Sequence, residues 1–177
     1  MVQYLLKDYS VLCMNVFLST NGFLYKRRLN QLTNNVQNEL PENYEELKKA
    51  ANRTSSWRVR FDAVEELGQH KHSKVIDVLT TRMTKDPVFK IQEAAYRQLK
   101  AFGEDVTAPK QTKFDIIKGT SKILLRIKKS LPADHTFEEF KEKFKKMRLD
   151  VYDAYEGEKG ADFEKWLETE WASLLKK

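Results

Sequence analysis

One apolar pattern occurs twice in this chain, and the second copy lies 32 residues after the first. Each copy places an aromatic residue, a β-branched residue, an alanine and a leucine at helical spacing. The matched pairs are Trp57 and Phe89, Val59 and Ile91, Ala63 and Ala95, and Leu67 and Leu99. A repeat of this length is typical of stacked helix pairs that share one hydrophobic core. The pattern therefore predicts a short helical-repeat solenoid.

The composition favours an all-α fold for the whole chain. Gly and Pro are scarce, with six and four among 177 residues, and β-branched alternation is nearly absent. Apolar residues make up 41% of the chain, which is enough for a core. Charged residues make up 33%, as on long solvated helix faces. We expect the solenoid to be followed by a small helical module.

The repeat resembles the short HEAT-like repeats of the bilin-lyase family over about residues 41–105. The resemblance rests on Trp57-Arg-Val-Arg-x-x-Ala63-Val64-x-x-Leu67-Gly68, on Val75-Ile-x-x-Leu79 in a second helix that completes the pair, and on Asp86-Pro87. It implies stacked helix pairs. Similarity to bilin lyases would also imply a tetrapyrrole partner, but the repeat alone does not carry that activity. The second copy departs from the pattern, because Gln92 replaces the usual Arg and Lys100 stands where Gly68 stood.

Changes in pattern divide the chain into four predicted parts. Residues 1–40 are predicted to form an N-terminal helical cap or a partly ordered extension, and residues 41–105 to form the repeats. Residues 106–113 are polar, contain Pro109 and are predicted to be a connector. Residues 114–177 are predicted to form a separate three- or four-helix module.

Capping residues mark the predicted helix ends. Ser55 or Ser56 is predicted to cap the first repeat helix, and Gly68 to follow its C-terminus with a positive φ. Asp86 and Pro87 are predicted as the N-cap and first residue of the next repeat helix. Capping boxes are predicted at Asn43-x-x-Glu46 and Thr136-x-x-Glu139, and a turn between Gly157 and Gly160.

The predicted architecture favours a binding function. Stacked helix pairs form an extended concave surface that commonly binds a partner. We therefore interpret the chain as a non-catalytic intracellular adaptor or scaffold whose partner protein is unidentified, with a self-supporting spacer as the alternative reading of the repeats. The residues that we assign to the partner-binding surface are Trp57, Arg58, Arg60, Lys90 and Arg97.

A basic stretch supports a second interpretation, nucleic-acid binding by a helix over 114–129. The net charge is +6, and seven basic residues but only one acidic residue lie between Lys110 and Lys129. Four cations fall on one helical arc, where they could contact phosphates: Lys118, Lys122, Arg126 and Lys129. The alternative is a solvated face balanced by acidic neighbours such as Glu138, Glu139 and Glu142.

An enzyme is the third interpretation. Some DNA alkylpurine glycosylases resemble HEAT-type solenoids, with Trp, Tyr, Arg and Asp at the lesion in a basic groove. The corresponding residue types here are Trp57, Arg58, Arg60 and Asp62 on one predicted helix, and Tyr96 and Arg97 on the next. The same residues could instead have structural roles: Trp57 would pack as a hydrophobic staple at the start of the helix, and Asp62 would be a solvated surface charge. We assign no catalytic residue.

Motifs for metals and cofactors are not recognisable. His70 and His72 lack Cys or acidic ligands at zinc spacing, and the chain has no phosphate-binding glycine loop. The single cysteine, Cys13, cannot form an intramolecular disulfide, so we expect a reducing compartment and a cytoplasmic location. No apolar run approaches the about 20 residues of a membrane-spanning helix. We expect no metal, no cofactor and no membrane association.

Overall fold

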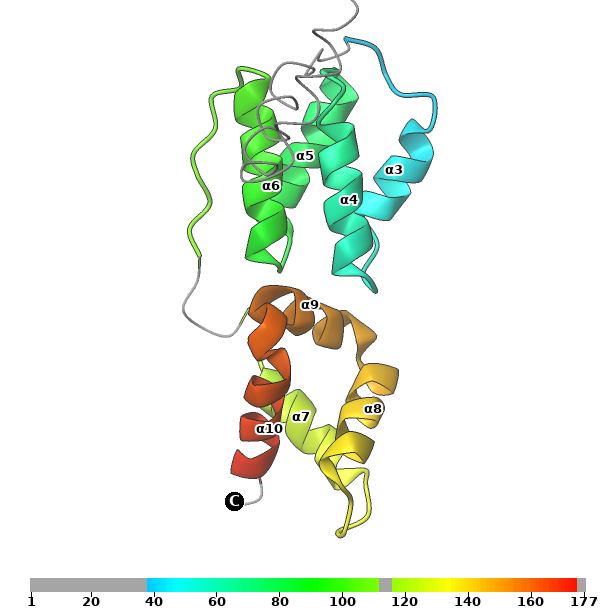
Figure 1. Cartoon of the computed structure of the whole chain (residues 1–177), viewed down its shortest axis with the longest axis vertical. Helices are drawn as coiled ribbons and strands as arrows, with labels where there is room; N and C mark the ends of the chain where they lie inside the picture. Colours follow the sequence, from blue (N-terminus) through cyan, green and yellow to red (C-terminus); the bar gives the residue numbers. More distant parts are fainter. Residues whose placement is uncertain (1–37, 112–115, 175–177) are drawn as a thin grey trace, which may run out of the picture. The chain divides into compact units, whose positions relative to one another are not determined.

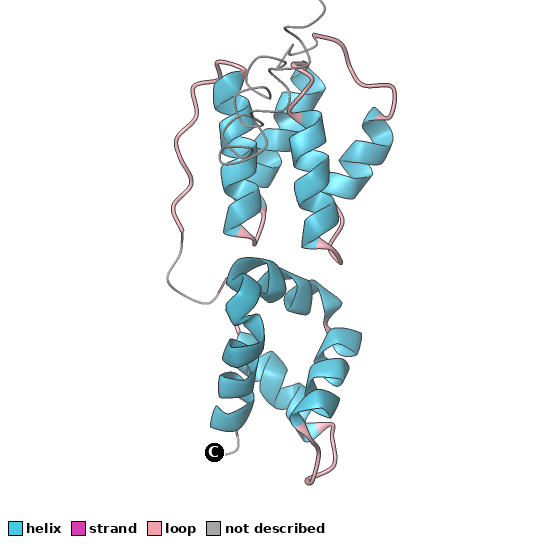
Figure 2. Ribbon diagram, viewed as in Figure 1, coloured by secondary structure: helices cyan, strands magenta, loops and turns pink. Residues whose placement is uncertain are grey.

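The computed structural model describes residues 38–111 and 116–174, and over these residues the chain is helical without strands (Figures 1 and 2). This confirms the predicted all-α fold class. The helices are α3 (Tyr44–Ala51), α4 (Trp57–Leu67), α5 (Ser73–Lys85), α6 (Phe89–Ala101), α7 (Thr120–Lys129), α8 (Phe137–Met147), α9 (Leu149–Lys159), the short 3-10 helix η1 (Gly160–Asp162) and α10 (Phe163–Ser173). The described residues all lie in one compact unit, residues 36–177. All of these helices belong to that unit, and the predicted N-terminal cap lies almost entirely outside the described residues.

Two helix pairs form the repeats. Helix α3 packs against α4, and α5 packs against α6. The pairs stack because α4 lies beside α6 and α3 contacts α5 (Figure 1). The sequence predicted that α4 and α5 would form one pair, so the helix register was right but the grouping was wrong. The equivalent helices α4 and α6 begin 32 residues apart, as the sequence repeat requires.

The alanine and leucine positions of the repeat form the first hydrophobic cluster. Their exposed fractions are at most 3%, and they belong to one cluster of α3 to α6: Ala63, Ala95, Leu67 and Leu99. The β-branched pair is not equivalent, since Ile91 is fully buried whereas Val59 is only half-buried. Val59 instead borders a surface hollow between α3 and α4. Neighbouring side chains of the first cluster cover Ile91, whereas the equivalent side of Val59 faces this hollow.

The helix ends agree with the predicted caps in part. Ser56 accepts a hydrogen bond from the Val59 amide and caps α4 as predicted. Gly68 has φ −63°, so the positive φ predicted for it is wrong. A Cβ atom at Gly68 would lie 2.2 Å from Cδ of Gln98, so this glycine instead allows α4 to approach α6.

The start of α6 differs from the prediction by two residues. Helix α6 begins at Phe89 rather than at Pro87. The Asp86 carboxylate still accepts a hydrogen bond from the Val88 amide (3.0 Å), so it satisfies a donor near the helix start. The box at Thr136 and Glu139 is confirmed. The Asn43 box is wrong, because the Asn43 side chain donates to Glu66 instead of capping α3.

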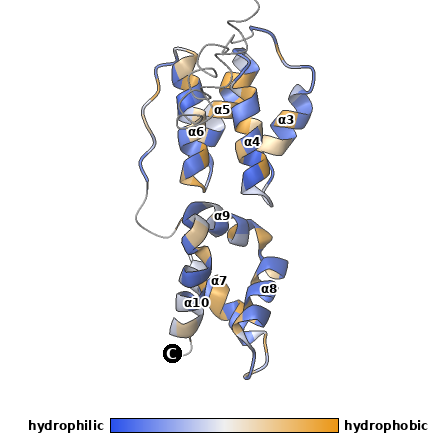
Figure 3. Ribbon diagram, in the orientation of Figure 1, coloured by the Kyte–Doolittle hydropathy of each residue, from blue (hydrophilic) through white to orange (hydrophobic). Residues whose placement is uncertain are grey.

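The helices after the connector form the second hydrophobic cluster. It contains Leu124, Ile127, Phe140, Phe144, Val151, Tyr152, Tyr155, Phe163 and Leu167. Aromatic rings make much of this core. Tyr152 meets Phe144 and Phe163 edge to face, with ring centres 5.5 and 4.9 Å apart, and Tyr155 stacks on Trp166 at 4.3 Å. In both clusters, the helices carry polar as well as apolar residues (Figure 3).

Helix α9 is the element that the sequence missed. The predicted turn between Gly157 and Gly160 is wrong, because α9 runs through Gly157 to Lys159. Of these two glycines, only Gly160 has a positive φ (56°). Five consecutive residues, from Val151 to Tyr155, are buried. A helix buried on several sides lacks the one-sided apolar pattern by which helices are recognised in sequences.

The basic helix is shorter than predicted. Helix α7 begins at Thr120, after Gly119 with φ 81°, whereas the sequence predicted a helix over 114–129. Residues 112–115 lie outside the described residues. The proposed division into domains at 41–105 and 114–177 stays a prediction. No helix in the described ranges is long and apolar enough to cross a membrane.

Candidate partner-binding site

Carboxylates of α9 cover the N-terminal ends of α4 and α6. Asp153 accepts a hydrogen bond from the Trp57 amide at 2.6 Å. Glu158 accepts one from the Phe89 amide at 2.7 Å. The first amides of a helix have no partner within the helix, and the helix dipole favours negative charge there. Helix α9 therefore supplies the same kind of contact to the equivalent ends of both repeats.

The Trp57 side chain is part of this contact. Its indole N–H donates to Glu156 at 3.1 Å, and Arg58 donates to the same carboxylate oxygen at 2.9 Å. The Arg58 guanidinium also lies 4.6 Å from the centre of the Trp57 ring. A Cβ atom at Gly157 would approach the Trp57 Cγ to 2.8 Å, so α9 packs directly on this residue.

Arg60 lies in a buried ionic network rather than on the surface. Its exposed fraction is 3%, and it donates to Asp86 at 3.0 Å and to Asp153 at 2.8 Å. Arg82 also contacts Asp86, at 3.4 Å. Gln92, which is equivalent to Arg60 in the second repeat, donates to the Asp86 backbone carbonyl at 2.6 Å. Arg60 therefore joins the repeats to α9, and we leave it out of the surface proposed below.

An exposed face of α4 and α6 carries the other predicted residues. The Lys90 ammonium lies 4.8 Å from the centre of the Phe61 ring and 5.4 Å from that of Trp57. Arg97 forms an ion pair with Glu65 at 3.2 Å. Because both contacts cross from α6 to α4, these side chains share one face. The docking face is defined here as Arg58, Phe61, Asp62, Glu65, Lys90, Glu93 and Arg97.

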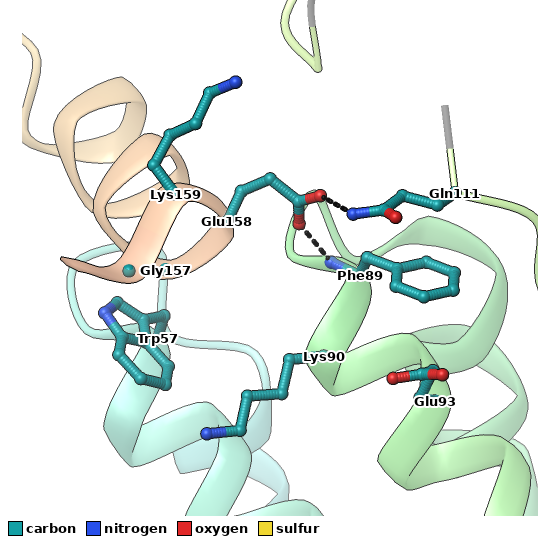
Figure 4. A pocket seen from close by; sticks show the side chains of 9 residues that line it. Trp57, Phe89, Lys90, Glu93, Gln111, Gly157, Glu158 and Lys159 are labelled. Carbon is teal, nitrogen blue, oxygen red and sulfur yellow. Dashed lines mark hydrogen bonds between the residues drawn. The ribbon is translucent and has the colours of Figure 1, made fainter. Parts of the chain in front are cut away.

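A cleft lies where this face meets α9 (Figure 4). Its volume is about 250 Å³, and Trp57, Lys90 and Gly157 are among its lining residues. Glu158 forms one wall, since it accepts from both the Phe89 amide and the Gln111 side chain (Figure 4). The cleft therefore combines aromatic rings, two lysines and the carboxylate of Glu158, which is already hydrogen-bonded.

The four predicted phosphate-binding cations are all exposed. Lys122, Arg126 and Lys129 lie on α7, and Lys118 lies just before it. Within residues 38–111 and 116–174, none of the four forms an ion pair. Glu138 contacts Lys141 instead, and Glu139 belongs to the cap of α8. The neighbouring Lys128 is different, because burial lowers its pKa and it donates to the Trp171 carbonyl.

Sequence reasoning missed the acidic residues of the site. The sequence predicted no role for Asp153, Glu156 and Glu158, and only their clustering within six residues could have indicated a shared one. Their partners lie about 70 to 100 positions earlier in the chain. In the described part of the chain, no group of three or more His, Cys, Asp or Glu residues could hold a metal ion.

Comparison with known proteins identifies one segment. The family model of HEAT repeats matches residues 35–110, which is less than half of the chain. No curated protein and no solved structure gave a match. The match spans α3 to α6, whose two stacked helix pairs place Ala63 with Ala95 and Leu67 with Leu99 in one core. The chain therefore contains a HEAT-like repeat segment over residues 35–110.

Proposed function

We propose that this protein is a non-catalytic adaptor that binds a partner protein through the docking face of α4 and α6. HEAT repeats generally mediate protein–protein interaction. The observation that carries the proposal is the pairing of equivalent positions on this face. Arg58 and Lys90 occupy one repeat position, and Glu65 and Arg97 occupy another, so charges of both signs line the two helices.

The chemistry of the face suits a protein surface with mixed charge. Phe61 is half-buried and provides an apolar contact beside the Lys90 ammonium. Aromatic residues and Arg are enriched at protein interfaces, and Arg is frequent among their energetic centres. The side chains of Arg97 and Arg58 are 61% and 62% exposed, so both remain accessible despite their ion pairs.

Charge reversal on α6 tests the proposal. We expect Lys90→Glu together with Arg97→Glu to abolish capture of the partner by purified full-length chain, while the circular dichroism melt stays unchanged. Lys146→Glu together with Lys165→Glu is the matched control, since both lysines are exposed and lie outside the docking face. Partner capture that survives in the α6 double variant would overturn the proposal. A photocrosslinking residue at Asp62 would show whether the partner lies on this face.

Nucleic-acid binding is a second candidate function. It is favoured by the four exposed cations at Lys118, Lys122, Arg126 and Lys129, which the predicted acidic neighbours do not pair. Binding through phosphate contacts should weaken steeply with salt, by a log–log slope of about −0.9 for each phosphate neutralised. Fluorescence anisotropy with duplex DNA at two salt concentrations measures this slope.

Two triple variants with the same change in net charge distinguish DNA binding by α7 from general electrostatic attraction. Lys118→Glu, Lys122→Glu and Arg126→Glu together should abolish binding. The control triple Lys48→Glu, Lys49→Glu and Lys74→Glu makes the same change in net charge with exposed residues of α3 and α5. Equal losses in the two triples would contradict a specific role for α7.

A further inference from the structure

A cavity of about 270 Å³ lies at the junction of the repeats and α9, away from the docking face. Its polar lining comes from three arginines, from Asn52 and Thr54 of the loop before α4, and from Asp150 at the start of α9. The arginines are Arg53, Arg60 and Arg82. A buried water needs only about 10–15 Å³ of such space, so a ligand of several atoms fits.

Two of these arginines keep nitrogens without partners. The Nε and Nη1 atoms of Arg60 are hydrogen-bonded, but its buried Nη2 has no partner among the described residues. The Nε atom of Arg82 is in the same state. Most buried polar groups are hydrogen-bonded, and a buried unsatisfied donor is costly, most of all on a charged group. The Arg60 side chain is only 3% exposed, so bulk solvent does not relieve this cost.

The charge around the cavity is also unbalanced. Three guanidinium groups line it, whereas only two carboxylates pair with them. Asp86 pairs with Arg60 and Arg82, and Asp153 pairs with Arg60. The carboxylate of Asp150 does not alter this excess of one positive charge, because both of its oxygens accept from Arg148, at 2.9 and 2.8 Å. An anion in the cavity would offset this excess charge.

We propose that this cavity binds a phosphate group, either as free phosphate or as a phosphate monoester. Phosphate offers several acceptor oxygens in different directions and matches the planar donor arrangement of arginine. Arg53 and Arg82 contact the phosphate oxygens directly, and the buried charge of Arg60 contributes to the attraction. The inference is independent of partner binding at the docking face.

Titration of the full-length chain with inorganic phosphate tests the inference. Two-dimensional NMR at constant ionic strength, with chloride as the balancing anion, follows the Nε–H signal of Arg82 and the amides of residues 52–54. We expect saturable shifts at these positions. A parallel titration with O-phosphoserine distinguishes a monoester from free phosphate as the preferred ligand. Shifts that do not saturate, or that appear only on α7, would overturn the proposal and indicate that water alone fills the cavity.

Variants with opposite expected effects on phosphate affinity distinguish a specific site from general attraction of phosphate to a basic protein. Arg82→Gln should weaken phosphate binding about tenfold, because it removes a charged hydrogen-bond donor. Asp150→Asn should tighten it, because a carboxylate leaves the lining and Arg148 is released. Arg53→Gln, at an exposed side chain, is the second test if Arg82→Gln fails to fold. Lys165→Gln removes the same charge outside the cavity and should leave the affinity unchanged. Equal losses in Lys165→Gln and Arg82→Gln would contradict a site here.

Discussion

Gly157 determines how closely α9 packs on the repeats. A methyl group there would lie 2.8 Å from Trp57 Cγ and 2.8 Å from Val88 Cγ2. Neither atom is the end of a flexible side chain, so the clash is not easily relieved. Gly68 differs, because its clash is with the mobile end of Gln98. The role of Gly157 inside α9 is thus to allow close approach rather than to adopt a positive φ.

Replacing Gly157 with alanine should therefore destabilise the fold. Elsewhere in a helix this change stabilises by about 0.5–1 kcal/mol. Here we expect a net loss of about 1–3 kcal/mol from overpacking. Urea denaturation measures the difference, and Lys159→Ala at an exposed position of the same helix is the control. A gain in stability for Gly157→Ala would show that α9 does not pack on Trp57.

Asp150 should make stability depend on pH. The hydrogen bonds from Arg148 lower the pKa of Asp150 below its ordinary value of 3.8. The ionised carboxylate therefore stabilises the fold above pH 3.8, and this contribution is lost as the pH falls through the lower folded-state pKa. Because the Asp150 side chain is 50% exposed, we expect Asp150→Asn to cost less than about 1 kcal/mol at pH 7.

Denaturant midpoints measured between pH 7 and pH 2 test this expectation. The gap between the wild-type chain and Asp150→Asn should close toward the acid end. Asp105→Asn, at an exposed loop position, is the control for the general effect of losing a carboxylate. A gap that stays constant with pH would mean that the Arg148 contact does not form.

At the scale of helices, the sequence predicted caps and the repeat, but it did not predict contacts between residues that are distant in the chain and outside the repeat. Ser56 and Thr136 cap their helices through neighbours only three residues away, so their roles were readable from the sequence. The stacking of α4 and α6 could be predicted because the apolar positions of the two repeat copies match. The burial of Arg60 was not, since its partner Asp153 lies 93 positions away on a helix with no one-sided apolar pattern.

Asp153 is the residue through which α9 should contribute most to stability. It accepts from both the Trp57 amide and the Arg60 guanidinium. Asp153→Ala leaves Arg60 buried with one carboxylate fewer and the first amide of α4 uncapped. Removing one partner of a buried ion pair costs about 3–5 kcal/mol, and we expect a loss in this range.

The free energy of unfolding in urea tests the role of Asp153. Glu168→Ala on α10 is the control, because Glu168 is an exposed carboxylate and α10 packs against α9. If Asp153→Ala costs no more than Glu168→Ala, the buried network does not hold α9 against the repeats.

For the whole molecule, the question is whether the two hydrophobic clusters unfold together. The sequence predicted separate modules joined by a connector. The contacts of α9 couple them, because its Tyr152 and Tyr155 belong to the second cluster while its carboxylates cap helices of the first. Loss of the second cluster should therefore expose the Trp57 and Phe89 amides even when the repeats stay folded.

Leu167→Ala tests this coupling, because Leu167 is fully buried in the second cluster. We expect a loss of about 2–5 kcal/mol from the lost contacts and the cavity. Hydrogen exchange at the Trp57 and Phe89 amides should accelerate by the same free energy, although both amides belong to helices of the first cluster. Ala172→Ser, at an exposed position of the same helix, should leave both rates unchanged. Unchanged exchange at Trp57 and Phe89 in Leu167→Ala would mean that these amides are protected without α9, and that the repeats and the C-terminal helices are independent domains.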